Sequence, residues 1–520
     1  MRNTGENVME LIIYEGYLRN KNTLCRELAV DPCEDRTETE RAILQKGYRK
    51  WGTELPKHLR GAFAFAFRDF ENGRLFCARD AFGIQSLYYH ITADGELLVG
   101  PDLSSILCTG KYKKSIDSSA LQTYLMLTYP AGEKTLYSGI KKLMPGRSLF
   151  YSERKLKIEQ WYLPIFEPDL SVSEEEWAKE IDQTLLNILS EDRSNVDFTE
   201  GISFISGGVD SSYLLAASRM QQACVIGFTD GITDESPQAQ KTAESLGTVF
   251  HKLFLSASDF MDVLPRFVRN MELPLADASA VCFAAGCEHI SEKTSLCISG
   301  EGADEFFAGY HIYKRAGELA LDGNALHYGC EGAMDAEQAA KLLCMDQPLP
   351  LDHLVKDLYD QTTGCEHLSR MLLIDISLWF EGDILMSAAR SARKNGLMVL
   401  FPYADTKMFE LSARIPSGLK LSGTCEKYIL RKAAEMRLPH STAFRPKAGF
   451  PNPAVQWLRS EKYCREIEKA LFSDDSKLFF DQELLTSFWK AYVEGDDLCF
   501  SKIFAVFIFI LWYRGFYDIL

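Results

Sequence analysis

The chain has 520 residues, which is enough for two or three domains that each bury a core. Its 46% apolar and 25% charged residues are those of a soluble globular protein, and its net charge of -16 argues against a nucleic-acid partner, which a basic surface would attract. The fourteen cysteines contain no CxxC pair, so reduced thiols in a cytoplasmic protein are expected, with neither a disulfide framework nor a zinc site.

The first part of the chain has the pattern of a β-rich domain. Five short runs with apolar alternation lie between Glu10 and Tyr151: LIIYEG, AFAFAFRDF, RLFCARD, SLYYH and ELLVG. Turn-like pieces such as FENGR and TADGE separate them. We therefore predict an antiparallel sheet in this region.

The pattern changes after the polar connection EPDLSVSEEEW, where a helix is expected to begin near Glu174. The strand-like GISFI, the turn SGGVDSS, the apolar helix YLLAASRM and the strand-like ACVIGFT then follow within about thirty residues. This order is that of a βαβ unit and predicts a parallel sheet. From about Asp357 helical periodicity prevails to the C-terminus.

No membrane attachment is expected from the apolar segments. The first residues have no long apolar core, so they do not form a signal peptide. The longest apolar run, Ile503 to Trp512, is too short to span a bilayer and predicts a buried terminal helix.

The turn SGGVDSS, residues 206–212, has the composition of an anion site. A glycine-rich turn between a parallel strand and a helix directs several backbone N–H groups and the helix dipole toward one point. Gly207 and Gly208 allow a phosphate to approach, while Ser206, Ser211 and Ser212 can donate hydrogen bonds and Asp210 can hold Mg²⁺. The alternative, a glycine-rich turn without a ligand, is disfavoured by the complete strand, turn and helix context.

This turn resembles the SGGxDS loop of the ATP pyrophosphatases, which cleave ATP between its α and β phosphates. Three further stretches resemble the asparagine synthetase family: residues 233–251, 298–310 and 445–453. Residues 59–89 and 135–149 are similar to the second half and the end of its glutamine-hydrolysing domain. The resemblance implies an α/β protein with two parts. Residues 1–160 would form a β-rich, N-terminal-nucleophile-type remnant, and residues 170–520 an ATP-pyrophosphatase domain with a helical C-terminal part.

The resemblance also assigns roles to single residues. Asp210 and Asp304 would share the Mg²⁺ of ATP, because this cation prefers carboxylate oxygens. Ser299 and Gly300 would line the adenosine pocket. Glu301 would order the acyl-adenylate and take a proton from the attacking amine. Lys447 would stabilise negative charge at the α-phosphate.

Two departures from the family pattern bear on function. The family's N-terminal cysteine is replaced by Arg2, the segment expected before LIIYEGYLRNK is missing, and Glu15 stands at the position of an oxyanion-binding asparagine. Cys25 and Cys33 lie within the chain, without the free amine that would serve as base. The first domain is therefore expected to be truncated and inactive in glutamine hydrolysis. A second copy or a partner subunit could complete it.

The second departure lies in residues 386–405, which resemble a charged stretch around the family's substrate pocket. Arg390, Pro402 and Asp405 are kept, whereas Ala389, Met398 and Leu400 replace charged residues. A pocket with less charge would be less suited to a small dicarboxylate such as aspartate.

The function expected from these patterns is an ATP-dependent, amide-forming ligase of the asparagine synthetase type, with ATP and Mg²⁺ as cofactors. A small-molecule or peptide carboxylate would be joined to ammonia or another amine. The alternative within this chemistry is a lasso-peptide macrolactam cyclase or a related amide synthetase; Glu301 argues against a β-lactam synthetase, which resembles this family but places a tyrosine there. A tRNA-modifying pyrophosphatase and a non-catalytic scaffold are disfavoured, the first by the acidic charge and the second by the intact motifs.

Overall fold

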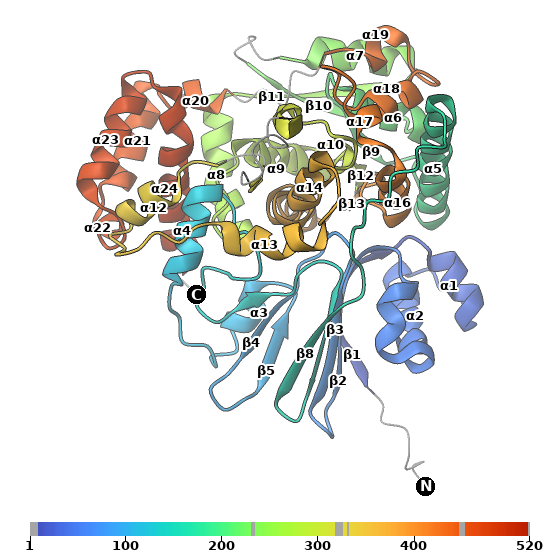
Figure 1. The fold of residues 1–520 in the computed structure, drawn as a ribbon, viewed down its shortest axis with the longest axis horizontal. Coiled ribbons are helices and arrows are strands. Elements are labelled where there is room, and N and C mark those ends of the chain that lie inside the picture. The colour runs from blue at the N-terminus through green and yellow to red at the C-terminus, as the bar shows by residue number, and fades with distance from the viewer. Residues whose placement is uncertain (1–8, 230–233, 318–325, 330–331, 447–452, 518–520) are drawn as a thin grey trace. The chain divides into compact units, whose positions relative to one another are not determined.

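A computed structural model describes residues 9–229, 234–317, 326–329, 332–446 and 453–517. The chain forms two compact units, whose elements are labelled in Figure 1. Unit 1 consists of Met1–Ser115, Gly132–Ile165 and Ser190–Val196, and unit 2 of Ile116–Ala131, Phe166–Leu189 and Asp197–Leu520.

Unit 1 contains the antiparallel sheet structure that its alternating runs predict. Its larger sheet has the strand order β1-β2-β3-β7-β8, and its smaller sheet has the order β5-β4-β6. All five predicted strands are confirmed, and three further strands complete the sheets. The bounds are β1 Glu10–Leu18, β2 Gly61–Asp69, β3 Arg74–Arg79, β4 Tyr88–Ile91, β5 Leu97–Gly100, β6 Lys141–Lys142, β7 Arg147–Ser152 and β8 Lys155–Gln160.

Unit 1 also contains helices that the sequence patterns did not predict. The helix α2 (Arg36–Trp51) begins at the cap Asp35, whose carboxylate accepts hydrogen bonds from the N–H groups of Thr37 and Glu38. Its apolar face belongs to the same buried cluster as the phenylalanines of β2, so burial against the sheet stabilises this largely polar segment. The other helices are α1 Lys21–Leu28, the short η1 Gly52–His58 and α3 Leu103–Leu107.

Unit 2 is built on a five-stranded parallel sheet with the order β11-β10-β9-β12-β13. The strand β9 (Ile202–Phe204), the helix α6 (Val209–Ser218) and the strand β10 (Gln222–Phe228) form the predicted βαβ unit. The other strands are β11 Val249–Leu255, β12 Leu296–Ile298 and β13 Met398–Leu400. Because β10 and β12 lie on opposite sides of β9, the direction of winding reverses between β9 and β12.

Helices surround this sheet in two groups: α6 contacts α7 (Ser236–Ser245), while α8 (Ala257–Met271) contacts α9 (Ala278–Ser291) and α15 (Met386–Lys394). The predicted predominance of helix after Asp357 is confirmed, and the short strand β13, which pairs with β12, lies within this helical part. The remaining helices are α4 Ser118–Leu127, α5 Glu174–Asn195, α10 Ala303–Phe307, η2 His311–Arg315, α12 Ala336–Leu342, α13 Asp352–Gln361, α14 His367–Asp375, η3 Ile376–Leu385, α16 Thr406–Arg414, α17 Ser417–Lys420, α18 Tyr428–Ala434, α19 His440–Ala443, α20 Ala454–Trp457, α21 Glu461–Leu471, α22 Asp474–Lys477, α23 Gln482–Val493, η4 Asp497–Cys499, α24 Phe500–Trp512 and η5 Tyr513–Tyr517.

The predicted terminal helix is present as α24, and its residues from Ile503 to Ile510 are buried. The helical run is longer than expected, because it continues through η5. Within the described chain, the segment Asp497–Tyr517 is the one helix whose length and apolar composition would allow it to cross a membrane, and 56% of its most apolar window is buried inside the protein. A buried core helix has the same properties.

Candidate active site

The candidate site lies where the sheet of unit 2 changes its winding direction. The turn that contains Ser206 follows β9, and the turn that contains Ser299 follows β12. These strands are parallel neighbours, so their carboxyl ends bring the two turns together. The two turns approach each other at Gly300, where an added Cβ would lie in ordinary van der Waals contact, 3.5 Å from the backbone nitrogen of Ser211.

The first turn is held by its own hydroxyl groups. The backbone N–H of Ser206 donates to Ser211 Oγ at 2.9 Å, and the N–H of Gly208 donates to Ser206 Oγ at 3.1 Å. Ser212 is fully buried, and its Oγ has no hydrogen-bond partner among the described residues. Gly208 caps α6, whose first turn contains Asp210, so the positive end of the helix dipole faces this turn.

One loop N–H already binds a carboxylate. The N–H of Gly207 donates to Glu235 Oε2 at 3.2 Å, and a Cβ on Gly207 would meet the side chain of Glu235 at 3.2 Å. This carboxylate oxygen accepts a backbone hydrogen bond of the kind that a phosphate oxygen would accept at a helix N-terminus. On the other side of the turn, Arg445 Nη1 donates to the carbonyl oxygen of Gly207 at 2.7 Å.

Asp210 and Asp304, the two predicted Mg²⁺ ligands, converge on one amine. Lys427 Nζ forms ion pairs with Asp210 Oδ2 and, at 2.7 Å, with Asp304 Oδ1. The lysine side chain is 1% exposed, against 19% and 22% for the two aspartates. Burial lowers the pKa of Lys427, but the charges of both aspartates outweigh this effect and raise it, so the amine stays protonated.

Two glutamates beside this triad have pKa values near neutrality. Burial, together with the charge of Asp304, raises the pKa of Glu301 to about 7 and that of Glu305 to about 8. Ser299 Oγ donates to Glu301 Oε1 at 3.2 Å, and Tyr310 Oη donates to Glu305 Oε1 at 2.5 Å. A carboxyl group with a pKa near 7 can exchange a proton at neutral pH, which suits Glu301 to acid–base chemistry.

The donor set fits a magnesium ion that arrives with a polyphosphate. Asp210 Oδ1 is buried and accepts no hydrogen bond within the described chain, so it has a lone pair available for a cation. In the described ranges, no three His, Cys, Asp or Glu side chains form a metal site by themselves. Mg²⁺ is usually bound by one or two carboxylates together with substrate phosphates and water, which matches the Asp210 and Asp304 pair.

Three residues of this site were missed from the sequence: Glu235, Lys427 and Arg445. Glu235 and Arg445 lie in the stretches 233–251 and 445–453, so their proximity to family motifs was a usable signal. Lys427 lies in none of the stretches that resemble the family. The predicted catalytic Lys447 lies outside the described residues, as does Arg2.

Arg390 is kept in the stretch that resembles the surroundings of the family's substrate pocket, and the structure places it in the protein core. Its guanidinium is 2% exposed, donates to Glu272 Oε2 at 2.8 Å and also binds the carbonyl oxygen of Met271. This cation is therefore used inside the protein core at the C-terminal end of α8. Asp405 likewise caps α16 by accepting a hydrogen bond from the N–H of Lys407.

The two apolar replacements in β13 differ in position. Met398 pairs with Leu296 at the amino end of the strand, away from the turn that contains Ser299. Leu400 pairs with Ile298 at the carboxyl end and is 1% exposed. Of these two, only Leu400 is near the site, as a buried apolar neighbour.

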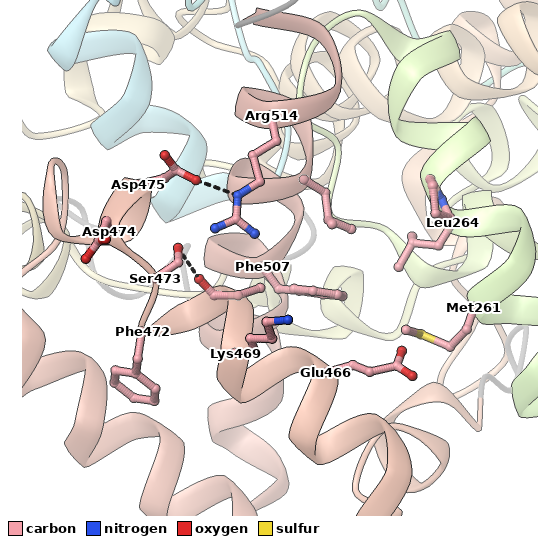
Figure 2. A pocket seen from close by; sticks show the side chains of 13 residues that line it. Met261, Leu264, Glu466, Lys469, Phe472, Ser473, Asp474, Asp475, Phe507 and Arg514 are labelled. Carbon is pink, nitrogen blue, oxygen red and sulfur yellow. Dashed lines mark hydrogen bonds and ion pairs between the residues drawn. The ribbon is translucent and has the colours of Figure 1, made fainter.

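A separate hollow of about 910 Å³ lies among α8, α21, α22 and α24 (Figure 2). Leu264 and Phe507 contribute apolar surface to it, while Lys469 and Arg514 contribute positive charge. Arg514 Nε is paired with Asp475 Oδ2 at 2.5 Å. None of the residues described above for the site lines this hollow.

In unit 1, Glu15 lies on β1 opposite Ala64. Four described cysteines belong to this unit, and burial raises the pKa of two of them, Cys25 and Cys77. A raised pKa keeps a thiol protonated and therefore weakens it as a nucleophile.

These features define unit 2 as a parallel α/β domain with a candidate site at its topological switch point. Comparison with known proteins identifies the family: residues 193–514 match the Asparagine synthase family, and residues 1–162 match the Glutamine amidotransferase domain. The chain belongs to the asparagine synthase family, whose members are ligases that use ATP, generally with Mg²⁺.

Three relatives illustrate the range of this similarity. Asparagine synthetase (glutamine-hydrolyzing) 1 of Bacillus subtilis is 27% identical, over 96% of this chain and 85% of its own length. Asparagine synthetase (glutamine-hydrolyzing) 3 of the same organism is 28% identical, over 85% and 75%. The Amidase chyE of Penicillium rubens is 29% identical, over 51% of this chain and 42% of its own length.

Proposed function

We propose that this protein is an AMP-forming amide ligase, which activates a carboxylate with ATP and transfers the acyl group to an amine. The single observation that carries this proposal is the convergence of Asp210 and Asp304 on Lys427, beside a glutamate that can exchange a proton. A scaffold would gain little from four charged groups in this arrangement, because burying charges is costly.

In the first step, an oxygen of the substrate carboxylate attacks the α-phosphorus of ATP, and the bond to the β-phosphate oxygen breaks to release pyrophosphate. The turn from Ser206 to Ser212 and the N-terminus of α6 bind the departing phosphates. Ser299 and Gly300 lie beside them and line the adenosine side. A Mg²⁺ ion held by Asp210 and Asp304 would supply neutralisation of phosphate charge.

In the second step, the amine nitrogen attacks the acyl carbon of the mixed anhydride, and the bond from that carbon to the AMP oxygen breaks. Glu301, in its ionised form, accepts the proton that the nitrogen loses. Lys447 is proposed to stabilise the charge on the AMP that departs, as an ammonium group near the α-phosphate would.

The most conservative substrates are aspartate and ammonia. A second candidate is a larger or less charged carboxylate, including a peptide, joined to another amine. The core pairing of Arg390 with Glu272 and the buried Leu400 favour this second candidate, because both remove charge from the substrate side. In either case, we propose a cytoplasmic protein that acts on small or peptide substrates, without nucleic acid or membrane. We also propose that a second copy of the chain or a partner subunit completes unit 1.

The test is exchange of labelled pyrophosphate into ATP, with a panel that includes aspartate, aliphatic acids and peptide acids. We expect carboxylate-dependent exchange and, with an amine present, AMP and pyrophosphate in equal amounts. Release of ADP and phosphate would contradict the proposal. Preference for aspartate over every other acid would support the conservative form and exclude the second candidate.

A further inference from the structure

Arg431 joins two separate segments of the candidate site. It lies in α18 and is 4% exposed. Its Nε donates to the carbonyl oxygen of Glu426 at 2.8 Å, and its Nη1 donates to those of Ala443 and Arg445, each at 2.8 Å. One side chain therefore binds the backbone before α18 and the backbone after α19.

Both segments carry a cation of the site. Glu426 immediately precedes Lys427, which pairs with Asp210 and Asp304. Arg445 binds the carbonyl oxygen of Gly207 in the turn after β9. The contacts run from the acidic cluster through Lys427, Arg431 and Arg445 back to the turn after β9, so they form a continuous series that returns to the turn next to Asp210.

The backbone at Lys427 needs such support. Its φ of +54° is in the left-handed region, which a residue with a side chain adopts only at a cost. The hydrogen bond from Arg431 fixes the carbonyl group just before this residue, and the N–H of Arg431 donates to the carbonyl oxygen of Lys427 at 2.9 Å. Arg431 thus holds the strained residue from both of its peptide groups.

We propose that Arg431 is a positioning residue, which sets the distance between Lys427 and Arg445 so that both cations meet the phosphates of one nucleotide. This inference rests on the proposed function, but its structural part can be tested without activity. The planar guanidinium has five N–H donors in a fixed geometry, so it can serve three carbonyl groups together. A lysine has a single nitrogen and cannot reach both segments in the same way.

The first experiment is hydrogen–deuterium exchange of the ligand-free full chain, comparing Arg431→Lys with wild type. Faster exchange in both residues 422–427 and residues 441–446 is expected, because one substitution releases both segments. The matched control is Arg437→Lys, since Arg437 is also a partly buried arginine, bound to Asp182 at 2.5 and 2.6 Å. This control should leave both segments at the wild-type rate. Release of only one segment, or of neither, by Arg431→Lys would overturn the inference.

The second experiment measures the dissociation constant of Mg·ATP by calorimetry. We expect Arg431→Lys to weaken binding at least tenfold, while Arg437→Lys binds like wild type. Added guanidinium, at concentrations too low to denature, should restore ATP binding to Arg431→Ala, because the ion can refill a cavity lined by three carbonyl oxygens. Equal ATP affinity of Arg431→Lys and wild type would contradict a positioning role. If the wild-type protein itself failed to bind ATP, the proposed function would be refuted. Hydrogen–deuterium exchange would still decide whether Arg431 couples the two segments.

Discussion

Lys427 Nζ lies 2.7 Å from Asp304 Oδ1 and simultaneously pairs with Asp210, so one buried cation holds together carboxylates from the first turns of two different helices, α6 and α10. Two carboxylates that contact the same amine are close enough to repel each other unless a positive charge lies between them. In this arrangement, the lysine occupies the electrostatic role that a divalent cation would take. The site is therefore ordered around its acids before a nucleotide binds.

A substitution at Gly309 tests this arrangement of Lys427 and the two aspartates without changing a charged group. A Cβ at this position would lie 1.9 Å from both Asp304 Oδ1 and Lys427 Cε, so the pair would have to move apart. We expect Gly309→Ala to lower pyrophosphate exchange by about tenfold or more, in line with the cost of misplacing reacting groups by about 1 Å. The control is Gly418→Ala, where an added Cβ has no heavy atom within 4 Å. Wild-type exchange by Gly309→Ala would show that the pair is not needed in this geometry.

The two aspartates should be separately essential. Asp210→Asn and Asp304→Asn each remove one charge from the proposed metal pair, and loss of a few kcal/mol of charge stabilisation lowers the rate by about 100-fold or more. Both variants should keep a melting temperature close to that of wild type, because Lys427 retains one partner. Asp169→Asn, at a carboxylate that accepts from Ser171, serves as control. Undiminished exchange by either variant would remove that residue from the metal site.

The pKa of Glu301 predicts how amide formation, the second step of the proposed reaction, depends on pH. This pKa is raised to about 7 by burial and by the charge of Asp304, and a base must be ionised to accept a proton. Amide formation should therefore rise as the pH increases through about 7 and fall about tenfold per pH unit well below it. The amine also titrates, so the measured quantity is the ratio of the wild-type rate to that of Glu301→Gln. A ratio that stays constant from pH 6 to pH 8 would argue against Glu301 as the base.

Glu235 should weaken ATP binding in the wild-type protein. Its carboxylate accepts the hydrogen bond of the Gly207 N–H and places negative charge next to the proposed phosphate position. Removing that charge with Glu235→Gln should tighten Mg·ATP by about threefold to tenfold, which corresponds to roughly 0.6–1.4 kcal/mol. Glu244→Gln, in the helix α7 that Glu235 precedes as its N-cap, is the matched control. Weaker ATP binding in Glu235→Gln would mean that the carboxylate helps to hold the nucleotide.

Glutamine hydrolysis is expected to be absent. Glu15 would place a carboxylate where the family resemblance puts an oxyanion donor, and burial raises the pKa of the Cys25 thiol. The measurement is glutamate release from glutamine, with and without ATP, against a Cys25→Ser, Cys33→Ser double variant. Turnover in wild type that this variant lacks would show that unit 1 is an active glutaminase.

The parts of the fold that could be predicted are those coded by neighbouring residues. Alternation gave the five strands of unit 1, and the run from GISFI to ACVIGFT gave the βαβ unit, because strand, turn and helix are adjacent in sequence. The helix α2 was missed since it is polar along most of its length, and only its tertiary contact with β2 shows its buried face. The three residues of β13 are too few to carry a periodic signal inside a helical region.

The same limit applies to the site. Asp210 and Asp304 could be named from their motifs and the family resemblance, and the structure brings both carboxylates to Lys427, while their role as metal ligands stays a prediction. Lys427 could not be named in this way, because its importance comes from contacts with Asp210 and Asp304, which are far away in sequence. Arg431 binds carbonyl groups within 14 residues of itself, and no local sequence pattern indicates these contacts. Arg390 illustrates the same limit: it is kept from the family pattern, but local sequence does not show that Glu272 binds it in the core.

The triad of Asp210, Lys427 and Asp304 also ties ligand binding to the integrity of unit 2. Its members come from three distant parts of the chain, so they meet only after the parallel sheet and the helices beyond it have assembled. A nucleotide that binds them would bind the native state and not the unfolded chain, which raises the free energy of unfolding by mass action. Saturation at 100 times the dissociation constant corresponds to about 2.7 kcal/mol. The thermal stability of this protein would then report on nucleotide supply, and a cell depleted of ATP would hold it nearer to unfolding and to proteolysis.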